Sequence, residues 1–236
     1  MSSNEPLIKD CGTLYIVGTP IGNLKDVSFR VLRTLKEVDL IAAEDTRHTR
    51  KLLSHYDIHT PLTSFYEYNQ EKKAPYLIKK IREGANIALV SKAGMPGISD
   101  PGYHLIKKAV EADIQIIPVP GPCALVVALV ASGLPADRFV FEGFLGRTRK
   151  ERINKLKTLS EEKRTIVIYE SPHRILKILP EIKQTLGDRR IALARELTKK
   201  FEEIMRGRVS DVEKIFDQKK PQKPRGEFTL IIEGAK

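Results

Sequence analysis

Carboxylates stand at the ends of several apolar segments of this 236-residue chain. Each ends a predicted strand or lies in a loop that follows one. They are Glu44, Asp45, Asp100, Glu170 and Glu196. A carboxylate within hydrogen-bond reach of a hydroxyl can act as a general base, so these five residues are candidate catalytic groups. For Glu44 and Asp45 a second interpretation is equally good, in which they cap the next helix and pair with Arg47.

Four loops that follow predicted strands have the composition of a ligand site. They are "GTPIGN" (18–23), "AEDTR" (43–47), "SKAGMPGISDPG" (91–102) and "PGPCA" (120–124). In open parallel sheets, ligands bind at the carboxyl ends of the strands. Glycine lets the backbone approach a ligand closely, and proline stiffens that approach. Any one loop alone is typical of a tight turn, but four at one edge predict a small-molecule cleft.

Several common sites are not predicted. The sequence lacks both the phosphate-binding pattern G-x-x-x-x-G-K-[ST] and the dinucleotide pattern G-x-G-x-x-G. His55 and His59 are spaced to share a helix face, but no third ligand is evident, so we expect no metal. Two cysteines, Cys11 and Cys123, favour a reducing cytoplasm over a disulfide scaffold. We also expect no secretory signal and no membrane span, because no apolar run approaches about 20 residues.

The elements that must position these residues alternate in the first half. Strands are predicted at 13–18, 39–44, 61–65, 86–91 and 114–119. Between them the helical patterns cover 28–38, 46–55, a segment that stops near Gly84, and 103–112. In the first of these helices we expect Ser28 as N-cap and Phe29, Leu32 and Leu35 on one face. Short strands alternating with helices indicate a mostly parallel sheet with covered faces.

The pattern changes near residue 121. Five further strands are predicted, at 138–144, 165–170, 190–196, 201–207 and 226–234. Only three helical stretches lie among them, at 150–159, 173–186 and 210–218. Adjacent strands without an intervening helix favour a mixed sheet. We therefore expect two α/β domains: a mostly parallel one at 1–121 and a mixed-sheet α+β one at 122–236. The apolar segment 123–135 fits either a core or an interface.

The net charge of +11 is distributed unevenly. Residues 1–146 contain 17 Lys and Arg against 16 Asp and Glu, whereas residues 147–236 contain 24 against 14. A basic half favours a polyanionic partner such as nucleic acid, although lysine-rich solvated helix faces would give the same composition. The candidate phosphate contacts are Arg47, Arg147, Arg149, Lys150, Arg174, Arg195 and Lys199. Two basic segments, 146–152 and 219–225, are the first in which charge reversal should weaken nucleic-acid binding.

Ordered motifs along nearly the whole chain, residues 13–234, resemble those of one family. They are "LYIVGTPIGNLKD", "AAEDTRHTRKLL", "AGMPGISDPG", "PVPGPCAL", "SGLP", "FEGFL", "YESPHR", "ARELTKKFEE" and "GEFTLIIEG". By these motifs the sequence resembles the ribosomal RNA small subunit methyltransferase I family, within the tetrapyrrole-methylase superfamily. The resemblance implies a tetrapyrrole-methylase-like fold, with S-adenosylmethionine in a cleft between two α/β domains. It also implies a homodimer that methylates the 2′-oxygen of a cytidine ribose in the decoding region of 16S rRNA.

The resemblance also implies which positions contact the cofactor. They are Pro20, Lys92, Gly94, Met95, Cys123, Ala124, Tyr169, Ala194 and Phe228. Two of them depart from the family loop S-D-A-G-T-P, because Lys92 stands for aspartate and Met95 for threonine. An aspartate can accept hydrogen bonds from the cofactor, whereas a lysine only donates and repels its cations. If Lys92 points to solvent, only its backbone matters. Longer members continue past the last residues of this chain into a helical extension.

Methyl transfer to a ribose hydroxyl is an in-line displacement, in which positioning does much of the work and a base near the hydroxyl helps. Two rival functions stay open. One is a small-molecule methyltransferase of the tetrapyrrole type, which the basic second half opposes. The other is a ribosome-assembly protein that binds RNA and has lost catalysis through Lys92. We expect the assembled small subunit, rather than free RNA, to be the substrate.

Overall fold

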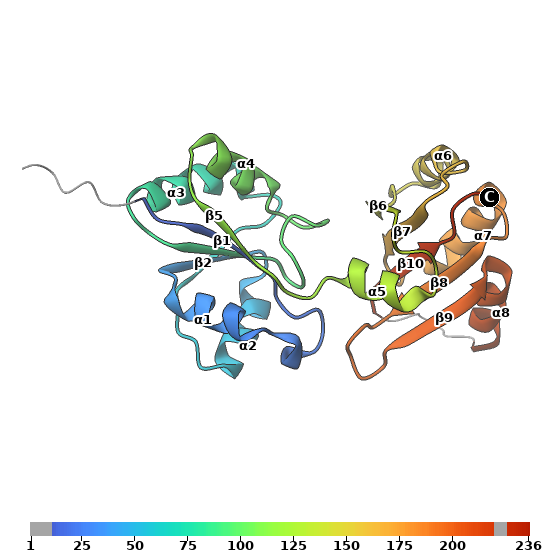
Figure 1. Cartoon of the computed structure of the whole chain (residues 1–236), viewed down its shortest axis with the longest axis horizontal. Helices are drawn as coiled ribbons and strands as arrows, with labels where there is room; N and C mark the ends of the chain where they lie inside the picture. The colour runs from blue at the N-terminus through green and yellow to red at the C-terminus, as the bar shows by residue number, and fades with distance from the viewer. Residues whose placement is uncertain (1–10, 220–225) are drawn as a thin grey trace, which may run out of the picture. The chain divides into compact units, whose positions relative to one another are not determined.

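The computed structural model describes residues 11–219 and 226–236, and the chain divides into two compact units, Met1–Pro122 and Cys123–Lys236 (Figure 1). Most of the basic segment 219–225 singled out above therefore lies outside the described residues. None of the helices among the described residues is long and apolar enough to cross a membrane.

A five-stranded sheet forms the centre of the first unit. All its paired strands run parallel, in the order β3-β2-β4-β1-β5. The strands are β1 (Leu14–Val17), β2 (Leu40–Ala43), β3 (Leu62–Ser64), β4 (Ile87–Val90) and β5 (Ile116–Val119). Side chains alternate between the two faces. In β4, for example, Ile87 and Leu89 join one core cluster while Ala88 and Val90 join the other. The predicted parallel sheet with two covered faces is confirmed.

Helices cover both faces of this sheet (Figure 1). One face carries α1 (Phe29–Glu37) and α2 (Thr46–His55), and the other carries α3 (Gln70–Arg82) and α4 (Tyr103–Glu111). A short 3₁₀ helix, η1 (Leu24–Asp26), precedes α1. Ser28 caps α1 as predicted, with its hydroxyl accepting from the Val31 N–H. The expectation for Phe29 is wrong, since it is 91% exposed. The buried stripe of α1 runs through Val31, Thr34 and Leu35, and Phe29 lies roughly 200° around the helix from Val31.

The order of the strands creates a topological switch point between β1 and β4. From β1 the chain crosses through α1 to β2, and from the neighbouring β4 it crosses through α4 to β5, in the opposite direction. These two helices lie on opposite faces of the sheet. The loops after β1 and β4 therefore diverge, which is where open α/β sheets bind ligands.

The second unit contains a mixed five-stranded sheet, in the order β6-β7-β10-β8-β9. Its strands are β6 (Phe139–Phe144), β7 (Thr165–Glu170), β8 (Arg190–Arg195), β9 (Glu203–Arg208) and β10 (Phe228–Ile232). The β6–β7 pair is parallel and the other pairs are antiparallel. Three helices pack on one face: α6 (Arg149–Thr158), α7 (Ile175–Leu186) and α8 (Val209–Lys219). The predicted mixed sheet is confirmed.

A fourth helix of this unit, α5 (Ala124–Ser132), was not predicted. Its sequence, ALVVALVAS, is apolar on all sides, so no period of 3.6 residues marks it as a helix. It packs against β7, β8, β9 and β10 and ends at Gly133 in the left-handed conformation, with φ of +75°. Leu125, Ala128 and Leu129 are buried, which makes one side of the segment 123–135 core, while Val126 and Val130 are exposed.

Candidate functional site

The loops at the carboxyl edge of the first sheet are tied together across the switch point. Thr19, after β1, exchanges two backbone hydrogen bonds of 2.9 and 3.0 Å with Gly94, after β4. The hydroxyl of Ser91 donates within the second loop, to the carbonyls of Ala93 at 3.2 Å and Gly94 at 3.3 Å. Pro20 is buried directly after Thr19. The site is thus built on backbone that its own hydrogen bonds hold in place.

Glycines let a third loop join the same edge. A Cβ on Gly18 would lie 2.5 Å from the sulfur of Met95 and 2.7 Å from the backbone of Gly121. A Cβ on Gly121 would lie 2.5 Å from the Gly18 carbonyl oxygen. Any side chain at either position would force the loops apart. Met95, a departure from the family pattern, therefore has a packing role against Gly18.

The loop after β2 contributes two carboxylates with different partners. Asp45 caps α2 by accepting from the backbone N–H groups of Arg47 and His48, at 2.9 and 3.0 Å. The hydrogen bond from His48 is the main reason why the pKa of Asp45 lies below its usual value. Glu44 instead accepts from the backbone N–H of Lys92 at 2.8 Å. Of the two original interpretations, capping describes Asp45, while Glu44 holds the loop after β4.

Lys92 and Asp100 lie in that loop with different exposures. Lys92 is exposed, and the Glu44 bond holds its backbone in place. Asp100 is half-buried. Neighbouring Ser99 has a positive φ of 60°, which is uncommon for a residue with a side chain. Arg47 is exposed at the start of α2.

In the second unit, three residues form one row across neighbouring strands. Tyr169 of β7 and Ala194 of β8 both pair with Thr229 of β10, so the three side chains share a face of the sheet. The Tyr169 hydroxyl accepts from the Leu125 N–H of α5 at 2.9 Å, which identifies this as the face under α5. Cys123 and Ala124 begin that helix. Sequence reasoning missed Thr229, because only the strand pairing places it between the other two.

Phe228 does not share this face. It is 1% exposed, and its ring centroid lies 6.1 Å from that of Phe216 of α8, within the core on the opposite side of the sheet. Successive residues of a strand point to opposite faces, so Phe228 and Thr229 cannot both project toward α5. The Phe228 side chain therefore does not lie on the face of Tyr169, and the cofactor contact implied for Phe228 stays a prediction that its backbone would have to fulfil.

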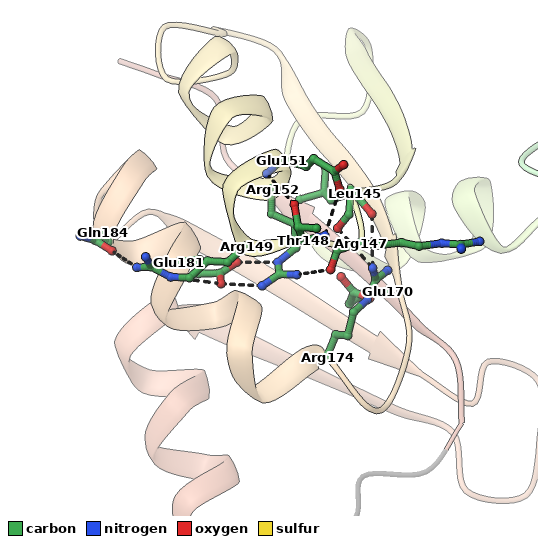
Figure 2. Close-up of polar contacts among 11 residues, drawn as sticks. Leu145, Arg147, Thr148, Arg149, Glu151, Arg152, Glu170, Arg174, Glu181 and Gln184 are labelled. Atoms are coloured by element: carbon green, nitrogen blue, oxygen red, sulfur yellow. Dashed lines mark hydrogen bonds and ion pairs between the residues drawn. The ribbon is translucent and has the colours of Figure 1, made fainter.

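Glu170 and Arg174, expected as a catalytic base and a phosphate contact, are paired with each other (Figure 2). The Oε1 atom of Glu170 accepts from Arg174 Nε and from the Ser171 N–H, both at 2.7 Å. Arg174 also donates to the carbonyls of Leu145 and Gly146, at 3.4 and 3.3 Å. Glu170 is fully buried, and its Oε2 atom has no hydrogen-bond partner among the described residues. This geometry makes Glu170 an anchor of the loop after β6.

The segment after β8 holds the other polar candidates in a strained turn. Arg195 Nε lies 3.6 Å from a carboxylate oxygen of Glu203, and Glu196 Oε1 lies 2.8 Å from the Lys199 ammonium. Glu196 and Thr198 have positive φ angles of 50° and 65°. Residues other than glycine hold this conformation at an energetic cost, and such residues cluster at functional sites. The turn is therefore a candidate site element of the second unit.

Basic side chains gather at the start of α6 and at the start of α7, where Arg174 is the N-cap and Lys177 follows. Arg147, Arg149 and Lys150 are all exposed, as phosphate contacts must be. Beside them lies a pair that sequence reasoning missed, in which buried Arg152 makes two hydrogen bonds of 2.7 Å to Glu181 (Figure 2). A sequence signal existed for this side of α7, because residues 174, 177, 181 and 184 are polar and recur at helical spacing.

Among the described residues, no group of three or more histidine, cysteine, aspartate or glutamate side chains is placed to hold a metal ion. His59, one of the histidines noted above, lies 3.0 Å from Asp57 on the surface. The polar groups of both units are instead arranged as backbone edges, carboxylates and arginines. Such a set suits an organic or phosphorylated ligand better than a metal ion.

Comparison with known proteins agrees with the motifs. Residues 13–213 match the family model described as Tetrapyrrole (Corrin/Porphyrin) Methylases. Ribosomal RNA small subunit methyltransferase I of Pasteurella multocida (strain Pm70) is 50% identical over 224 residues, which cover 94% of this chain and 79% of the relative. The protein of the same name from Thermotoga maritima is 48% identical, and the match covers 94% of this chain and 99% of that relative.

Solved structures show the same fold at low identity. Uroporphyrin-III C-methyl transferase from Thermus thermophilus, complexed with S-adenosylhomocysteine, superposes with a TM-score of 0.62 and 19% identity, over 93% of this chain and 97% of that one. The methyltransferase CobJ superposes with a TM-score of 0.69 and 18% identity, over 95% of each chain. The chain belongs to the tetrapyrrole methylases and, within them, to the ribosomal RNA small subunit methyltransferase I family.

Proposed function

We propose that this chain transfers a methyl group from S-adenosylmethionine to the 2′-oxygen of a cytidine ribose in 16S rRNA of the small ribosomal subunit. The observation that carries the proposal is identity of about half over nearly the whole chain with relatives named for methylation of this RNA. The switch-point loops of the first unit and the arginines of the second support it, because they supply a small-molecule edge and a polyanion surface.

The residues at the first edge fit the cofactor by their chemistry. S-adenosylmethionine carries a sulfonium and an ammonium group, and it supplies the methyl group from the sulfonium. Of the backbone N–H groups at this edge, that of Gly94 is bonded to Thr19 and Pro20 has none, so Met95 supplies the donor. The carboxylates of Glu44 and Asp100 stand in the same set of loops. Carboxylates favour bound cations, and backbone N–H groups can bind a carboxylate. Lys92 is the member of this set that does not fit.

In the second unit, Tyr169 is the half-buried member of its row, because Thr229 and Ala194 are buried beneath α5. We propose that the Tyr169 ring contacts the cofactor. Tyr169 is held by its bond from Leu125 and by edge-to-face contact with Phe141, at 4.9 Å between ring centroids. A side chain fixed in this way can orient a ligand without first losing rotamer freedom. We propose that Cys123 and Ala124, at the start of α5, line the same site, with Cys123 as a small apolar residue rather than a nucleophile.

The chain's part in the reaction is to orient the ribose and to accept its proton. Two carboxylates are poorly suited to that task, because Asp45 is a helix cap with a lowered pKa and Glu170 is buried against Arg174. Glu44 is occupied in part by the Lys92 N–H. We propose that a carboxylate oxygen of Asp100 or Glu196 accepts the proton of the 2′-hydroxyl, because both residues are half-buried in loops that follow strands and neither caps a helix. Glu196 would do so beside its partner Lys199, 2.8 Å away. In-line positioning supplies much of the remaining rate.

The proposal predicts methyl transfer to one substrate class. With labelled S-adenosylmethionine, small subunits from cells that lack this activity should become labelled in their RNA. Naked 16S rRNA should be labelled more slowly, because two rigid units can position a ribose best when the RNA is already folded. Uroporphyrinogen should remain unlabelled. Labelling of the tetrapyrrole alone, or of nothing while both ligands still bind, would contradict the proposal.

Lys92 gives a second prediction. Replacing it by aspartate should tighten S-adenosylmethionine binding by about 1–2 kcal/mol, because a repelling cation is exchanged for an acceptor of charge-assisted hydrogen bonds. Lys92→Met is the matched control, since it removes the charge without adding an acceptor, and it should give a smaller gain. Isothermal titration calorimetry measures both. Equal affinity for all three proteins would mean that this side chain lies outside the cofactor site.

We propose that the protein acts in the cytoplasm as a homodimer. A twofold assembly doubles the basic surface, so that one subunit can hold RNA while the other methylates it. Light scattering at micromolar protein concentration should therefore give twice the mass of 26.7 kDa. A monomer that methylates small subunits at full rate would refute this part of the proposal and leave the chemistry intact.

A further inference from the structure

A basic groove lies between α6 and α7 in the second unit. We call it the α6–α7 groove; its volume is ≈ 610 Å³. The charged side chains that line it are five cations and one carboxylate. They are Arg147, Arg149, Arg152, Arg174, Lys177 and Glu181. A groove lined in this way attracts anions strongly, because its low-dielectric walls focus the field.

Two of its arginines are structural. Arg152 and Glu181 are 6% and 7% exposed and share two hydrogen bonds of 2.7 Å. The hydrogen bond to Glu181 raises the pKa of Arg152, which keeps the guanidinium charged. Arg174 is held by Glu170 and by the carbonyls of Leu145 and Gly146. These side chains form a fixed floor whose negative charges are already neutralised.

The remaining cations are available to a ligand. Arg149 is 69% exposed; its Nε lies 3.8 Å from Glu181, which already holds Arg152, and its Nη2 reaches Gln184 at 3.4 Å. The side chains of Arg147 and Lys177 make no hydrogen bond or ion pair with any residue that the structure describes. The groove therefore has exposed hydrogen-bond donors above a rigid floor. Such a site loses little conformational entropy when an oxyanion binds.

The cations are spread along the groove rather than gathered at one point. Figure 2 shows Arg149 beside Glu181 and Gln184, whereas the Arg147 guanidinium extends away from that pair, on the other side of Arg152. A single phosphate would be bound by donors that converge. Donors in a row match a chain of phosphates, as in the backbone of a nucleic acid.

We infer that the α6–α7 groove binds the sugar–phosphate backbone of RNA, with Arg147, Arg149 and Lys177 as the contacting residues. The inference rests on the proposed function only for the choice of RNA among polyanions. Arg152 and Arg174 are positioning residues, because their guanidinium groups are bound to protein carboxylates. Backbone contacts of this kind fix the orientation of the RNA and carry no sequence information.

The test compares two double variants of the full chain. Arg149→Ala/Lys177→Ala removes two groove cations, and Lys157→Ala/Lys214→Ala removes two exposed lysines of α6 and α8 outside the groove. All four side chains are exposed, so both proteins should fold. Each is titrated with small subunits and with naked 16S rRNA over a series of salt concentrations. Lys177→Arg, which keeps the charge, should bind like the parent.

We expect the groove variant to bind both RNA probes about tenfold to a hundredfold more weakly near 0.1 M salt, with a logarithmic salt slope shallower by about 1.4 to 1.8. The control variant should stay within a factor of about three, and S-adenosylmethionine affinity should be unchanged in both. Unchanged affinity and slope in the groove variant would overturn the inference. Weaker binding to subunits but not to naked RNA would also overturn it, because the groove would then bind a ribosomal protein.

These outcomes separate the groove from the proposed function. Failure of the parent to methylate small subunits would remove the proposed function, yet the titration of naked RNA would still decide whether the groove binds phosphates. Conversely, the parent could methylate normally while the groove variant matches it in RNA affinity and in KM. That result would refute only the inference that the groove binds RNA.

Discussion

The buried pair of Arg152 and Glu181 is the interaction on which the polar chemistry of the second unit depends. It joins α6 to α7, and both side chains are almost completely excluded from solvent. Removing one partner of a buried pair leaves an uncompensated charge and costs about 3–5 kcal/mol. Because Glu181 makes both of its short hydrogen bonds to Arg152, it neutralises the neighbouring exposed Arg149 only weakly, from 3.8 Å. The second anchor, Glu170 with Arg174, fixes the loop from β6 into α6 in the same way.

The first unit is constrained by backbone rather than by charge. A parallel sheet delivers its loops to one edge, and the Thr19–Gly94 hydrogen bonds and the contact of Gly18 with Gly121 hold three of them together. The two units thus differ in the kind of group that they present to a ligand. In our proposal, the first unit offers close backbone and carboxylates to the cofactor, and the second offers the exposed cations Arg147, Arg149 and Lys177 to RNA.

Features that repeat along the chain could be predicted from sequence. The alternating strands and helices, the Ser28 cap and the mixed second sheet all follow from local periodicity. Features that depend on tertiary contacts between distant segments could not be predicted in this way. The face occupied by Phe228 follows from the pairing of β10 with its neighbours, and α5 lacks the polar side that reveals a helix. The Arg152–Glu181 pair joins residues 29 positions apart. The polar residues of α7 recur at helical spacing and mark that side of the helix, but they do not reveal that its partner is Arg152.

The central claim is that the chain methylates the ribose of a cytidine. The most direct measurement digests the RNA of treated small subunits to nucleosides and identifies the modified one by mass spectrometry. The account predicts one new nucleoside, 2′-O-methylcytidine, which is present only when protein and S-adenosylmethionine are both supplied. A methyl group on the base, or on the ribose of another nucleoside, would contradict it.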